Sequence, residues 1–79
     1  MLKISAGASV GLNSSALARV AYDDHRQHLH VEFRDGSAYL YLGVTSTIYQ
    51  ELLNAESPGV YLNRRIRNAY TSVRQPALG

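Results

Sequence analysis

The sequence predicts an α+β domain, a three-stranded antiparallel β-sheet (a meander) followed by two α-helices packed on one face. In the first half of the chain, apolar and polar residues alternate over residues 17–22 and 28–33, as in strands that bury one face. After residue 45 the apolar residues recur every three or four positions, which is the helical period. Because the period changes only once and there is no internal repeat, we expect one domain with one sheet and one helical layer.

The first two strands are predicted from alternation on either side of a polar turn. In the sequence ALARVAYDD, Ala18, Val20 and Tyr22 share one face, and DDHRQ then forms the turn. The next sequence, HLHVEF, alternates most clearly. Its apolar residues, Leu29, Val31 and Phe33, fall on one side of the strand, and His28, His30 and Glu32 fall on the other.

The third strand follows an Asp-Gly dipeptide at 35–36, which tolerates the positive φ angles of a tight hairpin. With a two-residue loop, the aliphatic side chains of the two strands oppose one another, and Tyr39 and Tyr41 stand across from Glu32 and His30 on the less apolar face. A three-residue loop would shift the pairing by one residue and place both tyrosines opposite aliphatic side chains. The match of apolar residues favours the two-residue loop.

A short first helix is predicted by a capping box and an apolar stripe. Thr47 with Gln50 fits the capping box, with an alternative start at Thr45, and the helix is expected to end near Asn54. The apolar stripe consists of Ile48, Leu52 and Leu53.

A second helix is predicted to begin with Ser57 as its N-cap and Pro58 at its first position. Residues at helical spacing are expected to face the sheet, namely Leu62, Ile66, Ala69 and Tyr70.

The two ends of the chain carry no such period. Residues 1–13 are expected to form an irregular arm with at most a short strand around residues 2–4, and residues 72–79 an extended or disordered tail. The domain itself is then expected to span residues 14–71.

The chain has 79 residues and no cysteine, so its core is small and no disulfide or thiolate metal site supports it. A domain of this size gains stability by pairing with a second copy, so a homo-oligomer is one expected state. No apolar run approaches the length of a membrane span, and a cytoplasmic location is the expected default.

The net charge of +2 is unevenly spread along the chain. Residues 1–56 carry four basic and six acidic side chains, whereas the residues from Ser57 onward carry no acid and four arginines, Arg64, Arg65, Arg67 and Arg74. Arginine suits phosphate oxygens and aromatic rings better than lysine because its guanidinium group is flat and forked. The carboxyl-terminal third therefore favours an anionic partner, although a solvated helix face would carry the same charges.

Five short motifs occur in order along most of the chain, namely Ser14-Ser15, Tyr22-Asp23, Tyr39-x-Tyr41, Ala55-x-Ser57-x-Gly59 and Asn63. Together they resemble the KTSC domain, a family found at the carboxyl terminus of some lysyl-tRNA synthetases and as short free-standing bacterial proteins. The resemblance implies a small α+β domain, for which RNA binding is the usual suggestion.

The Y-x-Y signature of that family falls on Tyr39 and Tyr41, and its later pattern falls on Tyr61 and Asn63. One departure bears on function. Leu62 stands where similar sequences tend to have an aromatic residue, which removes a ring that could have stacked on a base.

The favoured function is a small non-catalytic module that binds RNA, another single-stranded nucleic acid or a nucleotide. Single-stranded RNA is held by bases stacked on aromatic rings while arginines neutralise its backbone. The candidate ligand-binding residues are Tyr39, Tyr41, Tyr61, Asn63, Arg64, Arg65, Arg67 and Arg74. The two central tyrosines can equally be structural, and the sequence leaves open whether the tyrosine and arginine faces adjoin.

The alternative is a protein–protein interaction module or homodimeric adaptor, since exposed tyrosine and arginine are enriched in protein interfaces. A metal site at His25, His28 and His30 is weakly indicated, because spacing fixes no further ligand. Acid–base chemistry by His30 and Glu32 is equally weak, because nothing positions a nucleophile. We therefore expect no enzymatic activity, no cofactor and no resident metal.

Overall fold

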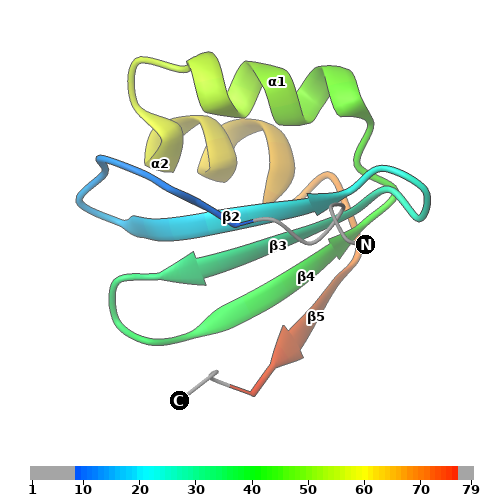
Figure 1. Ribbon diagram of the computed structural model, residues 1–79, viewed down its shortest axis with the longest axis horizontal. Helices are drawn as coiled ribbons and strands as arrows, with labels where there is room; N and C mark the ends of the chain where they lie inside the picture. The colour runs from blue at the N-terminus through cyan, green and yellow to red at the C-terminus, as the bar shows by residue number, and fades with distance from the viewer. Residues whose placement is uncertain (1–8, 77–79) are drawn as a thin grey trace.

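The computed structural model describes residues 9–76, which form a β-sheet with a helical layer on one side of it (Figure 1). Five antiparallel strands follow one another across the sheet in chain order, β1 (Ser9–Gly11), β2 (Leu17–Asp23), β3 (His28–Phe33), β4 (Ala38–Leu42) and β5 (Ser72–Gln75). Three helical segments connect β4 to β5, namely α1 (Ser46–Asn54), α2 (Pro58–Tyr61) and the π-helical η2 (Leu62–Ile66). No helix among the described residues is long and apolar enough to span a membrane.

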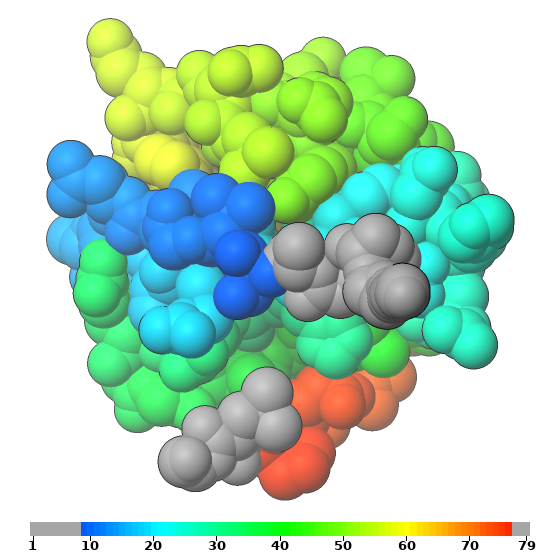
Figure 2. All heavy atoms as spheres, viewed as in Figure 1, coloured from blue at the N-terminus to red at the C-terminus, as the bar shows by residue number. Residues whose placement is uncertain are grey.

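The α+β class and the two-layer arrangement are as predicted, but the sheet has five strands and not three. The additional strands, β1 and β5, lie at the two edges (Figure 1). Their sequences, SVG and SVRQ, are too short and too exposed to give the alternating pattern on which the prediction relied. In the space-filling view, β5 lies along the lower edge and α1 at the top, with the first half of the chain between them (Figure 2). The strand expected around residues 2–4 falls outside the described residues.

The predicted register of the hairpin between β3 and β4 is wrong by one residue. Val31 pairs with Tyr39 and Leu29 pairs with Tyr41. A shift of one residue moves a side chain to the other face of a sheet. Both tyrosines therefore lie on the face that the helices cover, and not on the less apolar face.

The length of the hairpin loop explains this register. Phe33 donates its N–H to the carbonyl of Ser37 at 2.8 Å, which leaves three residues, 34–36, in the loop. Gly36 has φ +93°, as expected for the left-handed residue that closes a three-residue hairpin. The Asp35 carboxylate accepts hydrogen bonds from the backbone N–H and the hydroxyl of Ser37, at 2.9 and 2.6 Å. These local bonds fix a loop that the apolar matching of the strands did not predict.

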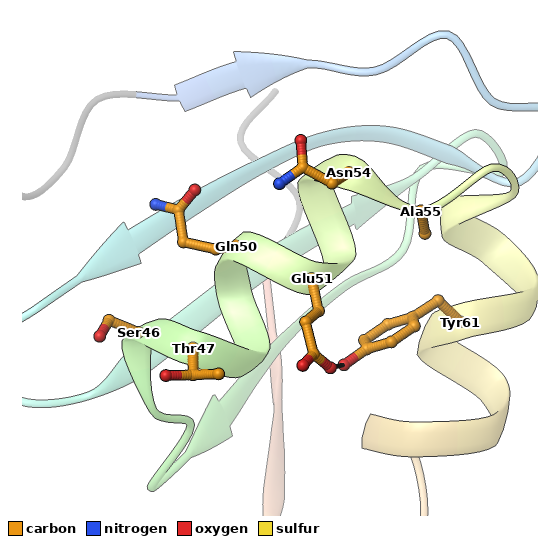
Figure 3. A pocket seen from close by; sticks show the side chains of 7 residues that line it. All are labelled: Ser46, Thr47, Gln50, Glu51, Asn54, Ala55 and Tyr61. Atoms are coloured by element: carbon orange, nitrogen blue, oxygen red, sulfur yellow. Dashed lines mark hydrogen bonds between the residues drawn. The ribbon is translucent and has the colours of Figure 1, made fainter.

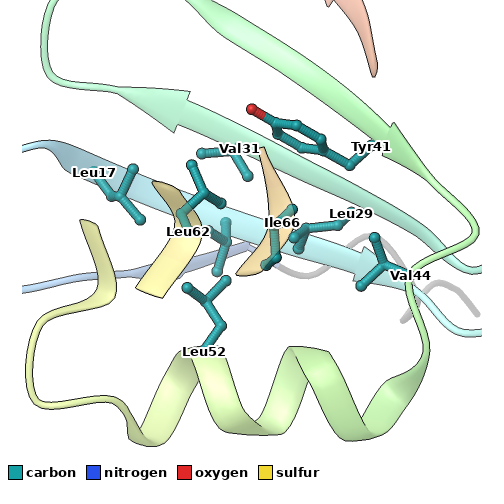
Figure 4. Close-up of a cluster of buried hydrophobic side chains, with 9 residues drawn as sticks. Leu17, Leu29, Val31, Tyr41, Val44, Leu52, Leu62 and Ile66 are labelled. Atoms are coloured by element: carbon teal, nitrogen blue, oxygen red, sulfur yellow. The ribbon is translucent and has the colours of Figure 1, made fainter. Parts of the chain in front are cut away.

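The core lies between the sheet and the helical segments (Figure 4). Nine side chains are buried there, Leu17, Val20, Leu29, Val31, Tyr41, Val44, Leu52, Leu62 and Ile66. Leu62 and Ile66 face the sheet as predicted, whereas Ala69 is exposed. The regular helical segment ends at Ile66 and residues 67–69 form a turn, so the helical spacing does not extend to Ala69.

Both helix starts agree with the capping patterns in the sequence. Thr45, the alternative start, is the N-cap of α1, and its hydroxyl accepts the N–H of Ile48 at 3.3 Å. Ser57 is the N-cap of α2, and its hydroxyl accepts the N–H of Val60 at 3.4 Å, with Pro58 at the first position.

Candidate nucleic-acid interface

The segment η2 separates apolar from basic side chains. Leu62 and Ile66 bury themselves against the sheet, while Arg64, Arg65 and Arg67 are exposed. Because the apolar residues are four apart, Arg64 and Arg65 lie on the remaining, outward side of the segment, and Arg67 follows as its C-cap. The segment therefore has a core side, as the spacing of Leu62 and Ile66 predicted, and a side that carries arginines.

The π-helical turn turns Arg67 toward the sheet. The N–H of Arg67 donates to the carbonyl of Leu62, five residues back, at 2.8 Å. A π turn contains more residues than an α turn. Arg67, five residues after Leu62, therefore points more nearly to the same side of the segment as Leu62 than it would in an α-helix. The guanidinium of Arg67 also donates to the side-chain oxygen of Asn63 at 3.3 Å.

Arg67 and Tyr41 connect the helical layer to β4. Burial raises the pKa of the Tyr41 hydroxyl, and the nearby positive charge of Arg67 partly offsets this rise. The Tyr41 side chain is 3% exposed, and its ring packs among core residues (Figure 4). The expectation that this ring stands on the less apolar face is therefore wrong, because the shifted register turns it into the core.

Tyr39 and Arg74 form a second contact between aromatic and basic side chains. The two residues are register partners on β4 and β5, and the guanidinium carbon of Arg74 lies 5.9 Å from the centroid of the Tyr39 ring. At this distance a guanidinium is attracted to the face of an aromatic ring. Tyr39 also meets the ring of Phe33 edge-on at 5.9 Å and lies 6.5 Å from the ring of Tyr41. The sequence interpretation missed Phe33 as a neighbour of Tyr39, because the predicted register placed the two rings on opposite faces of the sheet.

The arginines of the carboxyl-terminal third have no carboxylate partner within residues 9–76. The two ion pairs among these residues both lie in the first half of the chain, Arg19 with Glu32 at 3.4 Å and Arg26 with Asp23 at 3.1 Å. We call the unpaired group the arginine surface, which consists of Arg64, Arg65, Arg67 and Arg74. Since Arg67 lies by Tyr41 and Arg74 by Tyr39, the structure brings the basic segment and the tyrosine-bearing strand together.

Tyr61 belongs to a different place, a shallow groove between α1 and α2 (Figure 3). Its hydroxyl donates a hydrogen bond to the Glu51 carboxylate at 2.5 Å. Burial, followed by the hydrogen bond and the charge of Glu51, raises the pKa of Tyr61 to about 12. The structure does not bring Tyr61 together with Tyr39 and Tyr41.

The histidines do not form a metal centre with their neighbours in the described residues. No three histidine or acidic side chains within residues 9–76 lie close enough together to hold an ion. His28 and His30 pair with Leu42 and Leu40, so the predicted pairing of His30 with Tyr41 does not form.

A sequence profile of the KTSC domain matches residues 13–70, which is most of the chain. The chain belongs to the KTSC domain family. The match covers β2 to α2 and η2, and it excludes β1 and β5, the two edge strands that the sequence pattern also missed.

Known proteins similar to this KTSC domain come from several bacteria. An uncharacterised protein of Stutzerimonas stutzeri is 42% identical over 55 residues, covering 70% of this chain and 78% of that protein. A protein of Tsukamurella paurometabola is 34% identical over 62 residues, covering 78% of this chain and 92% of that protein. The crystal structure of a KTSC domain protein from Yersinia pestis superposes with a TM-score of 0.83 at 25% identity, covering 86% of this chain and 96% of that one.

Several motif positions have structural explanations in this KTSC domain. Ser14 accepts hydrogen bonds from the N–H groups of Ala16 and Leu17, both at 3.2 Å, and so shapes the entry into β2. Gly59 packs against the same segment, where a Cβ atom would lie 3.2 Å from that of Ala16. Tyr22 donates its hydroxyl to the carbonyl of Val44 at 2.6 Å. These residues hold the fold, which leaves the arginine surface as the candidate site.

Proposed function

We propose that this KTSC domain is a non-catalytic binding module for RNA or another single-stranded nucleic acid, which it holds at the arginine surface. The observation that carries the proposal is the absence of any carboxylate partner for these four arginines within residues 9–76. In the first half of the chain, Arg19 and Arg26 pair with carboxylates, and the guanidinium of Arg34 donates to the backbone carbonyls of Ser14 and Leu12. Guanidinium groups that form no ion pair can form paired hydrogen bonds with phosphate oxygens.

The arrangement also suits an extended ligand. Arg64 and Arg65 project from η2, Arg67 follows at its C-cap, and Arg74 projects from the edge strand β5. Since Arg67 and Arg74 lie beside neighbouring tyrosines of β4, the four charges extend from one element to the other. A single nucleotide would use only part of this surface, whereas a strand with successive phosphates would use all of it.

A protein-interaction module is the second candidate. Leu40 of β4 and Val73 of β5 are register partners on the sheet face away from the helices. Val73 is 45% exposed, and no helix of the described residues covers that face (Figure 1). An exposed apolar strand at a sheet edge is suited to pairing with another chain.

The test is a fluorescence-anisotropy titration of labelled oligouridylate at two salt concentrations. If four arginines contact phosphates, a fourfold rise in salt from about 50 to about 200 mM weakens binding about 50-fold. The variant Arg64→Ala/Arg67→Ala is expected to lose about tenfold or more in affinity at low salt and to halve the salt dependence.

The matched control is Arg19→Ala/Arg26→Ala, which removes the same charge from arginines that are already paired. This control is expected to bind within about threefold of the original chain. Equal losses in both variants would show that only net charge matters. Absence of binding at low salt by the folded chain would reject the nucleic-acid function and favour the protein-interaction module.

A further inference from the structure

The arginine surface offers charge without a free aromatic ring. The chain contains six tyrosines, one phenylalanine and no tryptophan, and all of them lie within residues 9–76. Tyr41 is buried and the other six are half-buried, so none is fully exposed. Proteins that stack bases on tyrosine need a ring face open to the ligand. This chain therefore has the charges of a nucleic-acid surface but no fully exposed ring beside them.

We propose that the arginine surface binds the phosphodiester backbone alone, without stacking any base, and that Tyr39 acts as a positioning residue for Arg74. The inference rests on the proposed function and specifies which part of the nucleic acid is recognised.

The surroundings of Tyr39 support the first part of the proposal. Its ring has Phe33 at one edge, Tyr41 at its side and the guanidinium of Arg74 over it. A base that stacked on the face beneath Arg74 would have to displace that guanidinium. Tyr41 is buried in the core, and Tyr61 is hydrogen-bonded to Glu51 in the groove between the helices.

The position of Arg74 supports the second part. Arg74 stands on a four-residue edge strand, and its side chain is exposed. A long side chain at such a position has many rotamers, and each one lost on binding costs free energy. The Tyr39 ring attracts the guanidinium before any ligand arrives, so less ordering is needed when a phosphate binds.

Backbone recognition has a direct consequence for selectivity. Sequence and base identity are read through base edges and stacked rings, whereas phosphates carry no sequence information. We expect oligonucleotides of equal length and different sequence to bind with affinities within about twofold of one another.

The deciding experiment compares a labelled oligothymidylate with an abasic phosphodiester of the same length and label. Backbone binding predicts affinities within about twofold of each other and the same dependence on salt. If bases stack on a ring, the abasic strand should bind about fivefold more weakly or worse for each base lost. That result would overturn the inference but leave the proposed function intact, whereas failure to bind either strand at low salt would reject the proposed function itself.

The role of Tyr39 is tested with Tyr39→Phe, Tyr39→Leu and Arg74→Ala, each shown to fold by its thermal unfolding. Arg74→Ala is expected to weaken binding of the abasic strand about 5- to 10-fold at about 50 mM salt. Tyr39→Phe retains the ring and should bind within about twofold of the original chain, whereas Tyr39→Leu should lose part of the affinity that Arg74 supplies.

The combined variant Tyr39→Leu/Arg74→Ala separates positioning from a structural role. If Tyr39 acts only through Arg74, the combined variant binds the abasic strand no more weakly than Arg74→Ala alone. A further loss in the combined variant would show that Tyr39 contributes independently and would overturn its positioning role.

Discussion

Two pairs of tyrosines occupy opposite electrostatic surroundings in this small domain. Tyr22 and Tyr49 stack between β2 and α1, with centroids 4.7 Å apart, and the charges of Asp24 and Asp23 lie near the Tyr22 hydroxyl. Tyr39 and Tyr41 lie side by side on β4, with Arg74 and Arg67 near them. Both pairs pack against the core, so burial alone does not distinguish them. The neighbouring charge does, because acidic side chains lie near one pair and arginines lie near the other.

The largest expected effect comes from removing the ring of Tyr41. Tyr41→Ala leaves a cavity in the core and should lower the free energy of unfolding by about 3 to 5 kcal/mol. Tyr41→Phe keeps the ring and should change it by less than about 1 kcal/mol. Urea unfolding followed by circular dichroism measures both. A loss below about 1 kcal/mol for Tyr41→Ala would place the ring outside the core.

A smaller loss of stability is expected from a change at Tyr22, in the pair that Tyr22 forms with Tyr49. Tyr22→Phe removes the hydrogen bond to the carbonyl of Val44 and should lower the free energy of unfolding by about 1 kcal/mol. Its affinity for oligouridylate should stay within about twofold of the original chain, because the acidic surroundings of this pair do not suit phosphates. If Tyr22→Phe weakened binding as much as Arg67→Ala does, the contrast between the two pairs would be wrong.

The smallest expected effect is a loss of stability at high pH. Burial raises the pKa of both Tyr22 and Tyr41 above 10.0, and nearby charge adds to the rise at Tyr22 but opposes it at Tyr41. Because the folded-state pKa values are raised, this contribution to stability is complete below pH 10 and is lost as the pH rises through those values. Urea unfolding should therefore show falling stability above pH 10.

The same titration sharpens the comparison when it is followed residue by residue. Carbon-13 NMR of the tyrosine Cζ atoms should show that Arg67→Ala raises the pKa of Tyr41, because a nearby cation is lost. The pKa of Tyr22 should not change in that variant. An unchanged pKa at Tyr41 would show that Arg67 does not lie near its hydroxyl.

The sequence predicted the central part of this fold because the signals there are strong. Alternation over β2 and β3, the cap at Ser57 and the inward direction of Leu62 and Ile66 each depend on a long period or a specific cap. The edge strands were missed because a strand of three or four exposed residues has no face to bury and so no pattern.

The candidate site was predicted less well, for a physical reason located in one loop. The arginines could be identified from composition, and their direction followed from Leu62 and Ile66. The position of the tyrosines depended on the register, which the bonds between Asp35 and Ser37 set through the loop length. Apolar matching could not detect this, because Tyr39 and Tyr41 serve as core-facing residues opposite Val31 and Leu29.

The π-helical turn of η2 constrains how this domain can change during evolution. Its hydrogen bond from Arg67 to Leu62 exists because the segment holds one more residue than an α turn needs. Deleting one residue there would restore an α-helix and rotate every later side chain about the helix axis. The guanidinium of Arg67 would then move away from Tyr41. A substitution at Arg67 alters one charge, whereas a single-codon deletion would redirect the whole following stretch. We therefore expect related chains to tolerate changes of residue type in this turn more readily than changes of its length.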